Sequence, residues 1–174
     1  HKEFSFEPGG YVVHFAATVT NQGKALTPSI AWGPGLGDRG AAAGGGSFLT
    51  GSAIQAPEAI FHRDGKVERV AQASVASTGP YEGQFRFAGI DDHYFVAVAI
   101  DPGQTRLDYQ PVTAAPLPGT GPERRLVSLV LTPTGPAKPV RFFVGPKQFD
   151  LLRAADSELV RAINFGMFAW LVVP

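Results

Sequence analysis

Glycine and proline interrupt this chain so often that few of its segments are long enough to form an extended helix. The 174 residues include 21 glycines and 15 prolines, and both residue types end or bend regular elements. Between them lie short runs that are rich in β-branched and aromatic residues. Runs of this kind at intervals of roughly ten residues, separated by turn residues, are typical of a β-sandwich or barrel. The sequence therefore predicts a mainly β fold.

The clearest run spans residues 11–20. Val13, Phe15 and Val19 share one face at period two, which predicts a half-buried strand. His14 falls on the other face, so we expect it to point to solvent or to line a concave surface. Further strands are expected at 26–32, 81–87, 94–100, 106–112, 126–131 and 140–144.

Turn residues indicate how some of these strands are connected. Asp64-Gly65 lies in the middle of 61–70 and predicts a hairpin with a two-residue turn. Pro28 predicts that the strand at 26–32 is an edge strand, because proline cannot donate a ladder hydrogen bond. Loops rich in glycine or proline are expected at 33–46 and 111–122.

After Gly145-Pro146 the spacing of the apolar residues changes from two to three or four, which predicts helix. We therefore expect helices only after this point, in a segment 147–174 that follows a β body at 1–146. Asp156 is a candidate internal N-cap, so two short helices in tandem are expected, and Gly166 can end the second. The apolar positions of this pattern are Phe149, Leu152, Ala155, Leu159 and Ile163.

Charge and cysteine content argue against several functional classes. Fifteen lysines and arginines balance fifteen acidic residues, which disfavours a broad nucleic-acid-binding surface. The chain has no cysteine, which excludes disulfides, Cys-ligated zinc, iron–sulfur clusters and thiol nucleophiles. Residues 35–40 match G-x-G-x-x-G, but no βαβ pattern surrounds them, so we expect a turn and no nucleotide. No cofactor and no nucleic-acid partner are expected.

The four histidines do not show the short paired spacing that is typical of metal ligands. The nearest candidate is Asp91-Asp92-His93, where adjacent carboxylates before a strand more often cap a turn. No G-x-S-x-G elbow occurs either. We therefore expect no metal site and no catalytic residues.

The last ten residues, 165–174, carry no charge. Either they fold back as a buried strand or they begin a membrane segment, and the residues alone leave both open. No segment of the chain reaches the roughly 18 apolar residues that a membrane helix needs.

Four motifs, in order along the chain, resemble the large periplasmic domain of the bacterial YidC membrane protein insertase family. The most specific are FFVGPKQFDLL at 142–152 and NFGMFAWL at 164–171. WGPGLGD at 32–38 and GIDDHYF at 89–95 are similar to family motifs as well. The resemblance covers most of the chain, whereas 40–79 is not diagnostic.

This resemblance implies a β-supersandwich of two antiparallel sheets with short C-terminal helices, on the periplasmic side of the inner membrane. It also implies a non-catalytic domain that assists the insertion and folding of nascent inner-membrane proteins. Docking of the Sec translocon and its SecDF accessory complex is expected. The membrane would be reached through flanking helices that this chain does not contain, the second of them following 147–174.

We expect the C-terminal segment 147–170 to be the functional part. Phe149 and Leu152 are expected to pack on the sandwich, at the interface through which the domain meets its partners or the membrane. Arg153 and Arg161 are candidates for contacts with lipid phosphates or a partner. Phe165, Phe168 and Trp170 lie beyond the helix end at Gly166 and are expected to reach toward the bilayer surface.

The alternative is a mutarotase-like or carbohydrate-binding β-sandwich. A mutarotase needs a histidine and a carboxylate that converge in the concave cleft for acid–base chemistry. No motif in the sequence indicates that they do. The candidates are His14, His62 and His93 with Glu58, Asp91 and Asp92.

Overall fold

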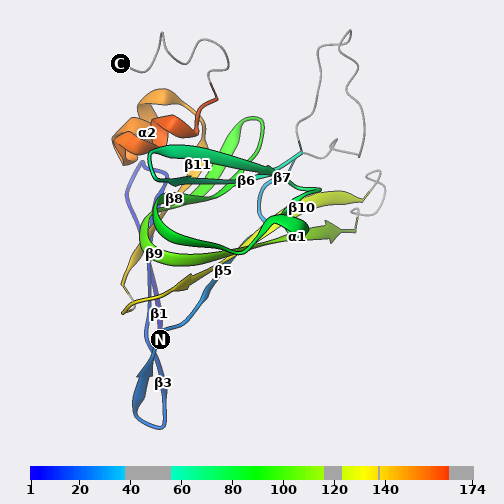
Figure 1. Cartoon of the computed structure of the whole chain (residues 1–174). Coiled ribbons are helices and arrows are strands. Elements are labelled where there is room, and N and C mark those ends of the chain that lie inside the picture. Colours follow the sequence, from blue (N-terminus) through cyan, green and yellow to red (C-terminus); the bar gives the residue numbers. More distant parts are fainter. Residues whose placement is uncertain (38–55, 116–122, 137, 165–174) are drawn as a thin grey trace, which may run out of the picture.

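The computed structural model describes residues 1–37, 56–115, 123–136 and 138–164. Strands dominate these ranges, and two short helices and one 3-10 helix accompany them (Figure 1). The strands are β1 Lys2–Phe6, β2 Val12–Ala17, β3 Val19–Asn21, β4 Lys24–Leu26, β5 Ile30–Trp32, β6 Glu58–Arg63, β7 Lys66–Ala71, β8 Tyr81–Asp91, β9 Phe95–Ala114, β10 Arg124–Pro133 and β11 Val140–Pro146. The helices are α1 Val75–Thr78, α2 Phe149–Ala155 and the 3-10 helix η1 Ser157–Ala162.

Nine of these strands form one large antiparallel sheet. Its main order is β1-β2-β11-β9-β8-β6-β7, and β10 adds to β9 and carries β5 on its other side. The strands β3 and β4 form a separate hairpin, whose turn residues Gln22 and Gly23 both have positive φ. The expected mainly β, antiparallel fold with short C-terminal helices is confirmed.

The long strand β9 joins two halves of this sheet. Residues 95–100 pair with β11, whereas 105–114 pair with β10. Between them the backbone bends at Asp101 and Gly103, which both have positive φ, and β8 has an irregular register at the same level, between Phe85 and Phe87. The strands expected at 94–100 and 106–112 are therefore one strand. The two sheets that the resemblance implies are joined into one sheet, because β8 and β9 run through both halves.

Side chains from both halves meet in the main core. Phe61 and Phe142 come from one half, Leu107 and Tyr109 from the other, and all are buried. The Tyr109 hydroxyl donates to the carbonyl oxygen of Ile60 at 3.0 Å, which ties the halves together. Burial raises the pKa of Tyr109, so its hydroxyl stays protonated and remains a donor.

A second core lies between the other face of the sheet and the C-terminal helices. Phe87 and Val98 of the sheet pack in one cluster with Leu152 of α2 and Leu159 of η1, all of them fully or almost fully buried. In Figure 1 the helices lie beside β11 at one end of the sheet. The apolar spacing in 149–163 therefore marks the helix face that covers the sheet.

Several local expectations are confirmed. The hairpin at 61–70 turns at Asp64-Gly65, both with positive φ. Among the described strands, β5, which follows Pro28, pairs only with β10 and therefore lies at an edge. The C-terminal helices are two in tandem, because the Asp156 side chain caps η1 by accepting from the Glu158 N–H at 2.9 Å.

Other expectations were wrong. α1 is a one-turn helix that precedes Pro146, so the helices are not confined to the C-terminal segment. Residues 111–114, expected in a loop, extend β9 because Arg124 to Val127 of β10 pair with them. The segment 26–32 is not one strand, because it contains the last residue of β4 and the whole of β5. The strand β1 was not expected at all. η1 ends at Ala162, whereas Gly166 lies outside the described residues.

Within the described ranges, the helices are too short or too polar to cross a bilayer.

Gly89 offers a direct test of how closely β8 and β9 approach. A Cβ at Gly89 would overlap the carbonyl oxygen of Ala97 and the Cα of Val98. Gly89→Ala should therefore lower the free energy of unfolding by about 1–3 kcal/mol, the usual cost of overpacking a core. Gly35→Ala is the matched control, because a Cβ there meets nothing within 4 Å. Urea unfolding measures both variants, and equal stabilities would contradict this packing.

Candidate functional site

A buried carboxylate lies where the sheet meets the C-terminal helices. Asp91 is the last residue of β8, and its side chain is only 2% exposed. Its Oδ1 lies 2.9 Å from Nζ of Lys147, the residue that follows β11. Its Oδ2 lies 3.5 Å from Nε of Arg69 on β7. We refer to Asp91, Lys147 and Arg69 as the Asp91 clamp.

The Asp91 clamp reaches both ends of the C-terminal helical segment. Lys147 precedes α2 by two residues. Arg69 donates through Nη2 to the carbonyl oxygen of Ala162, the last residue of η1, at 2.7 Å. One carboxylate on the sheet therefore fixes the chain at the entry to α2 directly and at the exit from η1 through Arg69.

Burial and charge oppose each other at Asp91. Burial raises the pKa of the Asp91 carboxyl, and the nearby positive charges of Lys147 and Arg69 work against this rise. A carboxylate taken out of water costs free energy unless cations and donors replace the lost solvation. The two cations are therefore what makes a charge tolerable at this position.

A further ion pair holds the junction between the two helices. Nη2 of Arg141 on β11 lies 3.5 Å from Oδ2 of Asp156, and its Nη1 donates to the carbonyl oxygen of Ala155 at 3.5 Å. Asp156 is also the residue that caps η1. The middle of the helical segment is thus tied to β11 while the clamp ties its ends.

The neighbouring acidic residue has a different role. Oδ1 of Asp92 accepts from the N–H groups of Tyr94 and Phe95 at 2.9 and 2.7 Å. Asp92 therefore caps the turn between β8 and β9, as expected for adjacent carboxylates before a strand. His93 is exposed and its ring lies edge-on to Tyr94. Among the described residues, no group of three acidic or histidine side chains is arranged to hold a metal ion.

The structure separates the predicted interface residues into different environments. Leu152 is fully buried and therefore has a structural role. Phe149, the first residue of α2, was expected to pack on the sandwich but is 38% exposed. Arg153 is exposed, and Arg161 pairs with Glu158 at 3.1 Å. The remaining predicted residues, Phe165, Gly166, Phe168 and Trp170, lie outside the described residues.

The three candidate histidines do not converge with the predicted carboxylates. His14 is bonded to Glu7 at 2.8 Å on the N-terminal strands. His62 is buried against η1, where its Nδ1 lies 3.4 Å from Oε2 of Glu158 without the geometry of a hydrogen bond. Burial lowers the pKa of His62, Arg161 and Arg86 also lower it, and Glu158 opposes this effect.

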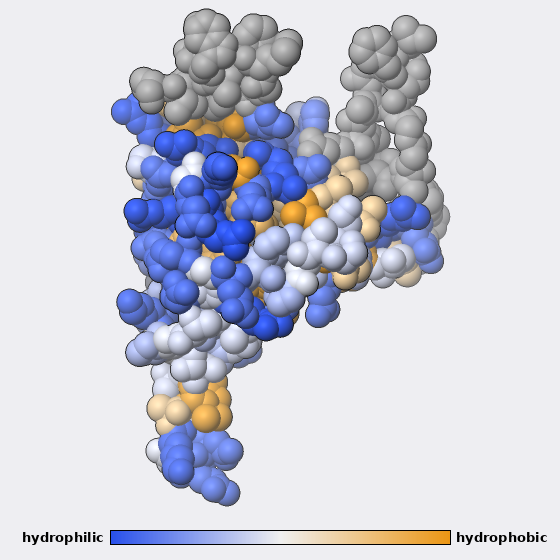
Figure 2. Space-filling view, viewed as in Figure 1, coloured by the Kyte–Doolittle hydropathy of each residue, from blue (hydrophilic) through white to orange (hydrophobic). Residues whose placement is uncertain are grey.

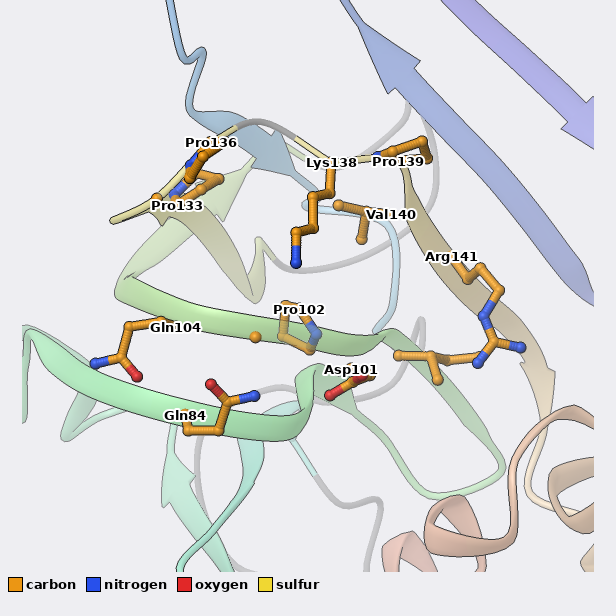
Figure 3. A pocket seen from close by; sticks show the side chains of 13 residues that line it. Gln84, Asp101, Pro102, Gln104, Pro133, Pro136, Lys138, Pro139, Val140 and Arg141 are labelled. Atoms are coloured by element: carbon orange, nitrogen blue, oxygen red, sulfur yellow. The ribbon is translucent and has the colours of Figure 1, made fainter.

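The bend in the sheet forms a cleft of about 470 Å³ (Figure 3). Gln84, Asp101 and Gln104 lie on one side, and Lys138 extends toward them from the proline-rich segment before β11. None of the described residues that line it is a histidine or an aromatic residue. The cleft therefore lacks both the acid–base pair of a mutarotase and the aromatic surface on which sugars stack.

The comparison with protein families agrees with the motifs in the sequence. The family model for the YidC periplasmic domain matches residues 1–174. The chain therefore belongs to the YidC periplasmic domain family, the non-catalytic periplasmic part of a membrane insertase. A search of curated proteins found no match.

The first prediction at this site concerns Asp91. Asp91→Asn leaves Lys147 and Arg69 without a counterion, and breaking a fully buried pair costs about 3–5 kcal/mol. Lys147 is 14% and Arg69 22% exposed, so we expect a smaller loss in the free energy of unfolding, about 2 kcal/mol. Urea unfolding measures it.

Two further variants make this test specific. Glu82→Gln removes one partner of the exposed Glu82–Arg106 pair and should leave stability unchanged. Asp91→Asn combined with Lys147→Met should recover part of the loss, because it removes one of the two unpaired cations. A cost of Asp91→Asn no larger than that of Glu82→Gln would contradict the clamp.

The second prediction concerns His62 and pH. Because the pKa of His62 is lowered on folding, the unfolded chain binds a proton at a higher pH than the folded chain. Wild-type stability should fall as the pH drops below the unfolded pKa of 6.5, and His62→Gln should flatten this slope. Urea unfolding between about pH 7 and pH 5 tests this, with exposed His93→Gln as the control. Parallel curves for wild type and His62→Gln would contradict it.

Proposed function

We propose that this domain is a docking platform that assists the insertion and folding of inner-membrane proteins. Its docking surface is the exposed side of α2, and its partners are the Sec translocon and the SecDF accessory complex. The observation that supports this is the Asp91 clamp, which fixes both ends of the helical segment to the sheet while one side of α2 stays exposed. A surface held in this way loses little conformational freedom on binding.

The composition of this surface also suits a binding role. Phe149 is a large apolar side chain that is 38% exposed, and Arg153 lies one turn further along the same helix. Aromatic residues and arginine are enriched where proteins bind one another. Within the described residues Arg153 forms no ion pair, whereas Arg161 pairs with Glu158 at 3.1 Å.

The chain that follows η1 would extend this surface toward the bilayer. Phe165, Phe168 and Trp170 are aromatic residues in a segment without charges, and aromatic side chains concentrate at membrane–water interfaces. In this proposal α2 meets protein partners, and residues 165–170 meet the lipid surface. Nascent inner-membrane proteins are the clients of the whole insertase.

Point variants in the intact insertase test the proposal better than a deletion of 147–170. Such a deletion would remove Lys147 and Leu152, and it would uncover the second core. Phe149→Ser with Arg153→Ser changes only exposed side chains of α2. It should weaken co-purification with SecDF by about tenfold, the effect of losing roughly 1.4 kcal/mol at an interface.

The matched control changes an exposed apolar residue and an exposed cation elsewhere. Lys24→Ser with Leu26→Ser does this on β4. We expect this control to bind SecDF and to complement a depleted strain as wild type does. If both double variants behave alike while expressed at equal levels, α2 is not the docking surface.

A further inference from the structure

The N-terminal strand β1 ends the large sheet, and within the described residues it pairs only with β2. All five of its residues are exposed. In Figure 1 the hairpin that carries β3 extends away from the body of the domain, next to the N-terminus. The surface view shows hydrophobic atoms on this narrow extension (Figure 2), where Val19 and Leu26 of the β3–β4 hairpin are exposed.

The ladder between β1 and β2 determines which backbone groups face outward. His1 donates its N–H to Thr18 O at 2.9 Å, and Thr18 donates to His1 O at 3.0 Å. At the other end of the ladder, Glu7 donates to Val12 O at 3.5 Å. Directly opposed residues alternate between bonded and non-bonded pairs in an antiparallel ladder. Odd-numbered residues of β1 therefore bond to β2.

It follows that Lys2, Phe4 and Phe6 direct their N–H and C=O groups away from β2. The same residues share one face of the strand, and there Phe4 is 56% and Phe6 71% exposed. The Phe4 ring lies against the Phe15 ring, with centroids 4.9 Å apart. Proline residues and β-bulges commonly prevent an edge strand from pairing with another chain. The strand β1 contains neither.

We propose that β1 pairs antiparallel with β1 of a second copy of this chain, across a two-fold axis at Phe4. In this register Lys2 lies opposite Phe6 of the partner subunit, and Phe4 lies opposite its own counterpart. Each outward-facing residue meets another outward-facing residue, so three pairs exchange six backbone hydrogen bonds. The two sheets become one sheet that continues across the axis.

The sequence of β1 favours this partner and this register. A shift by two residues in either direction leaves an outward-facing residue of each copy unpaired. In the central register no like charges oppose each other, because Lys2 faces an aromatic ring and Glu3 faces Ser5 of the partner subunit. A lysine beside an aromatic face also gains cation–π attraction.

The contact is small, which sets its strength. The surface area buried by pairing one five-residue strand is smaller than the roughly 1,200 Å² that stable complexes bury. We therefore expect the association to be weak in solution. Copies held on one membrane surface have a raised effective concentration, and a weak contact can then be occupied.

Sedimentation of the 174-residue chain from about 10 µM to 1 mM tests the proposal. Wild type should shift from monomer to dimer. Phe4→Lys and Phe4→Glu place like charges on the axis and should each weaken association at least tenfold, whereas an equimolar mixture of the two should restore it. Tyr94→Lys, at an aromatic residue 65% exposed elsewhere, should leave it unchanged.

Amide hydrogen exchange of the wild type gives an independent readout that needs no substitution. The amides of Phe4 and Phe6 should become protected as concentration rises, while those of Glu3 and Ser5 are protected throughout. Sedimentation as a monomer at 1 mM would overturn the proposal, and so would equal exchange of Phe4 and Phe6 at low and high concentration. Failure of the mixture to restore the dimer would overturn the register.

Discussion

The arrangement of this domain depends on one charge that is kept out of water. The Asp91 carboxylate can remain at the junction of sheet and helices only while Lys147 and Arg69 contact its two oxygens. These cations come from the end of β11 and from β7, on opposite sides of β8 in the sheet order. The requirement for both of them fixes where the chain leaves the sheet, and the bond from Arg69 to Ala162 fixes where η1 ends.

The motifs around the clamp have a physical explanation beside their family likeness. Gly145 precedes Pro146 and Lys147, and a Cβ on it would meet the Tyr11 ring at 2.7 Å. Gly89 lies two residues before Asp91, where β9 leaves no room for a side chain. Each glycine lets a neighbouring element come close, so that the charged residue two positions later reaches its partner. In both motifs, a glycine that permits close packing is therefore followed two positions later by a charged residue that forms an ion pair.

Local features of the fold could be predicted from the sequence, and contacts between distant segments could not. The turn at Asp64-Gly65 and the cap at Asp156 each depend on a few adjacent residues, and both were predicted. The continuity of β9 was missed, because Pro102 and Gly103 resemble a turn unless β8 is known to pair on both sides of them. Asp91 itself was taken for a turn cap, a role that belongs to Asp92. Of the predicted interface residues, Phe149 and Arg153 are exposed, whereas Leu152 is buried. The helical spacing of apolar residues predicts that one face of the segment is buried, but it does not show which residue is the first to be covered.

The two ends of the chain differ in how their hydrogen bonds and charges are satisfied, and this difference separates two kinds of surface. Along 147–162 the ends and the middle are tied to the sheet. In the proposed docking, a partner would therefore meet a fixed shape, and affinity would come from side chains such as Phe149. Along β1 one row of backbone groups is left for solvent, and any strand that covers it gains hydrogen bonds regardless of most of its side chains. Specificity at such an edge must come from the register of its few large residues. Phe4 and Phe6 supply that register here, which is why the self-pairing of β1 is defined by one axis and not by a range of slipped alignments.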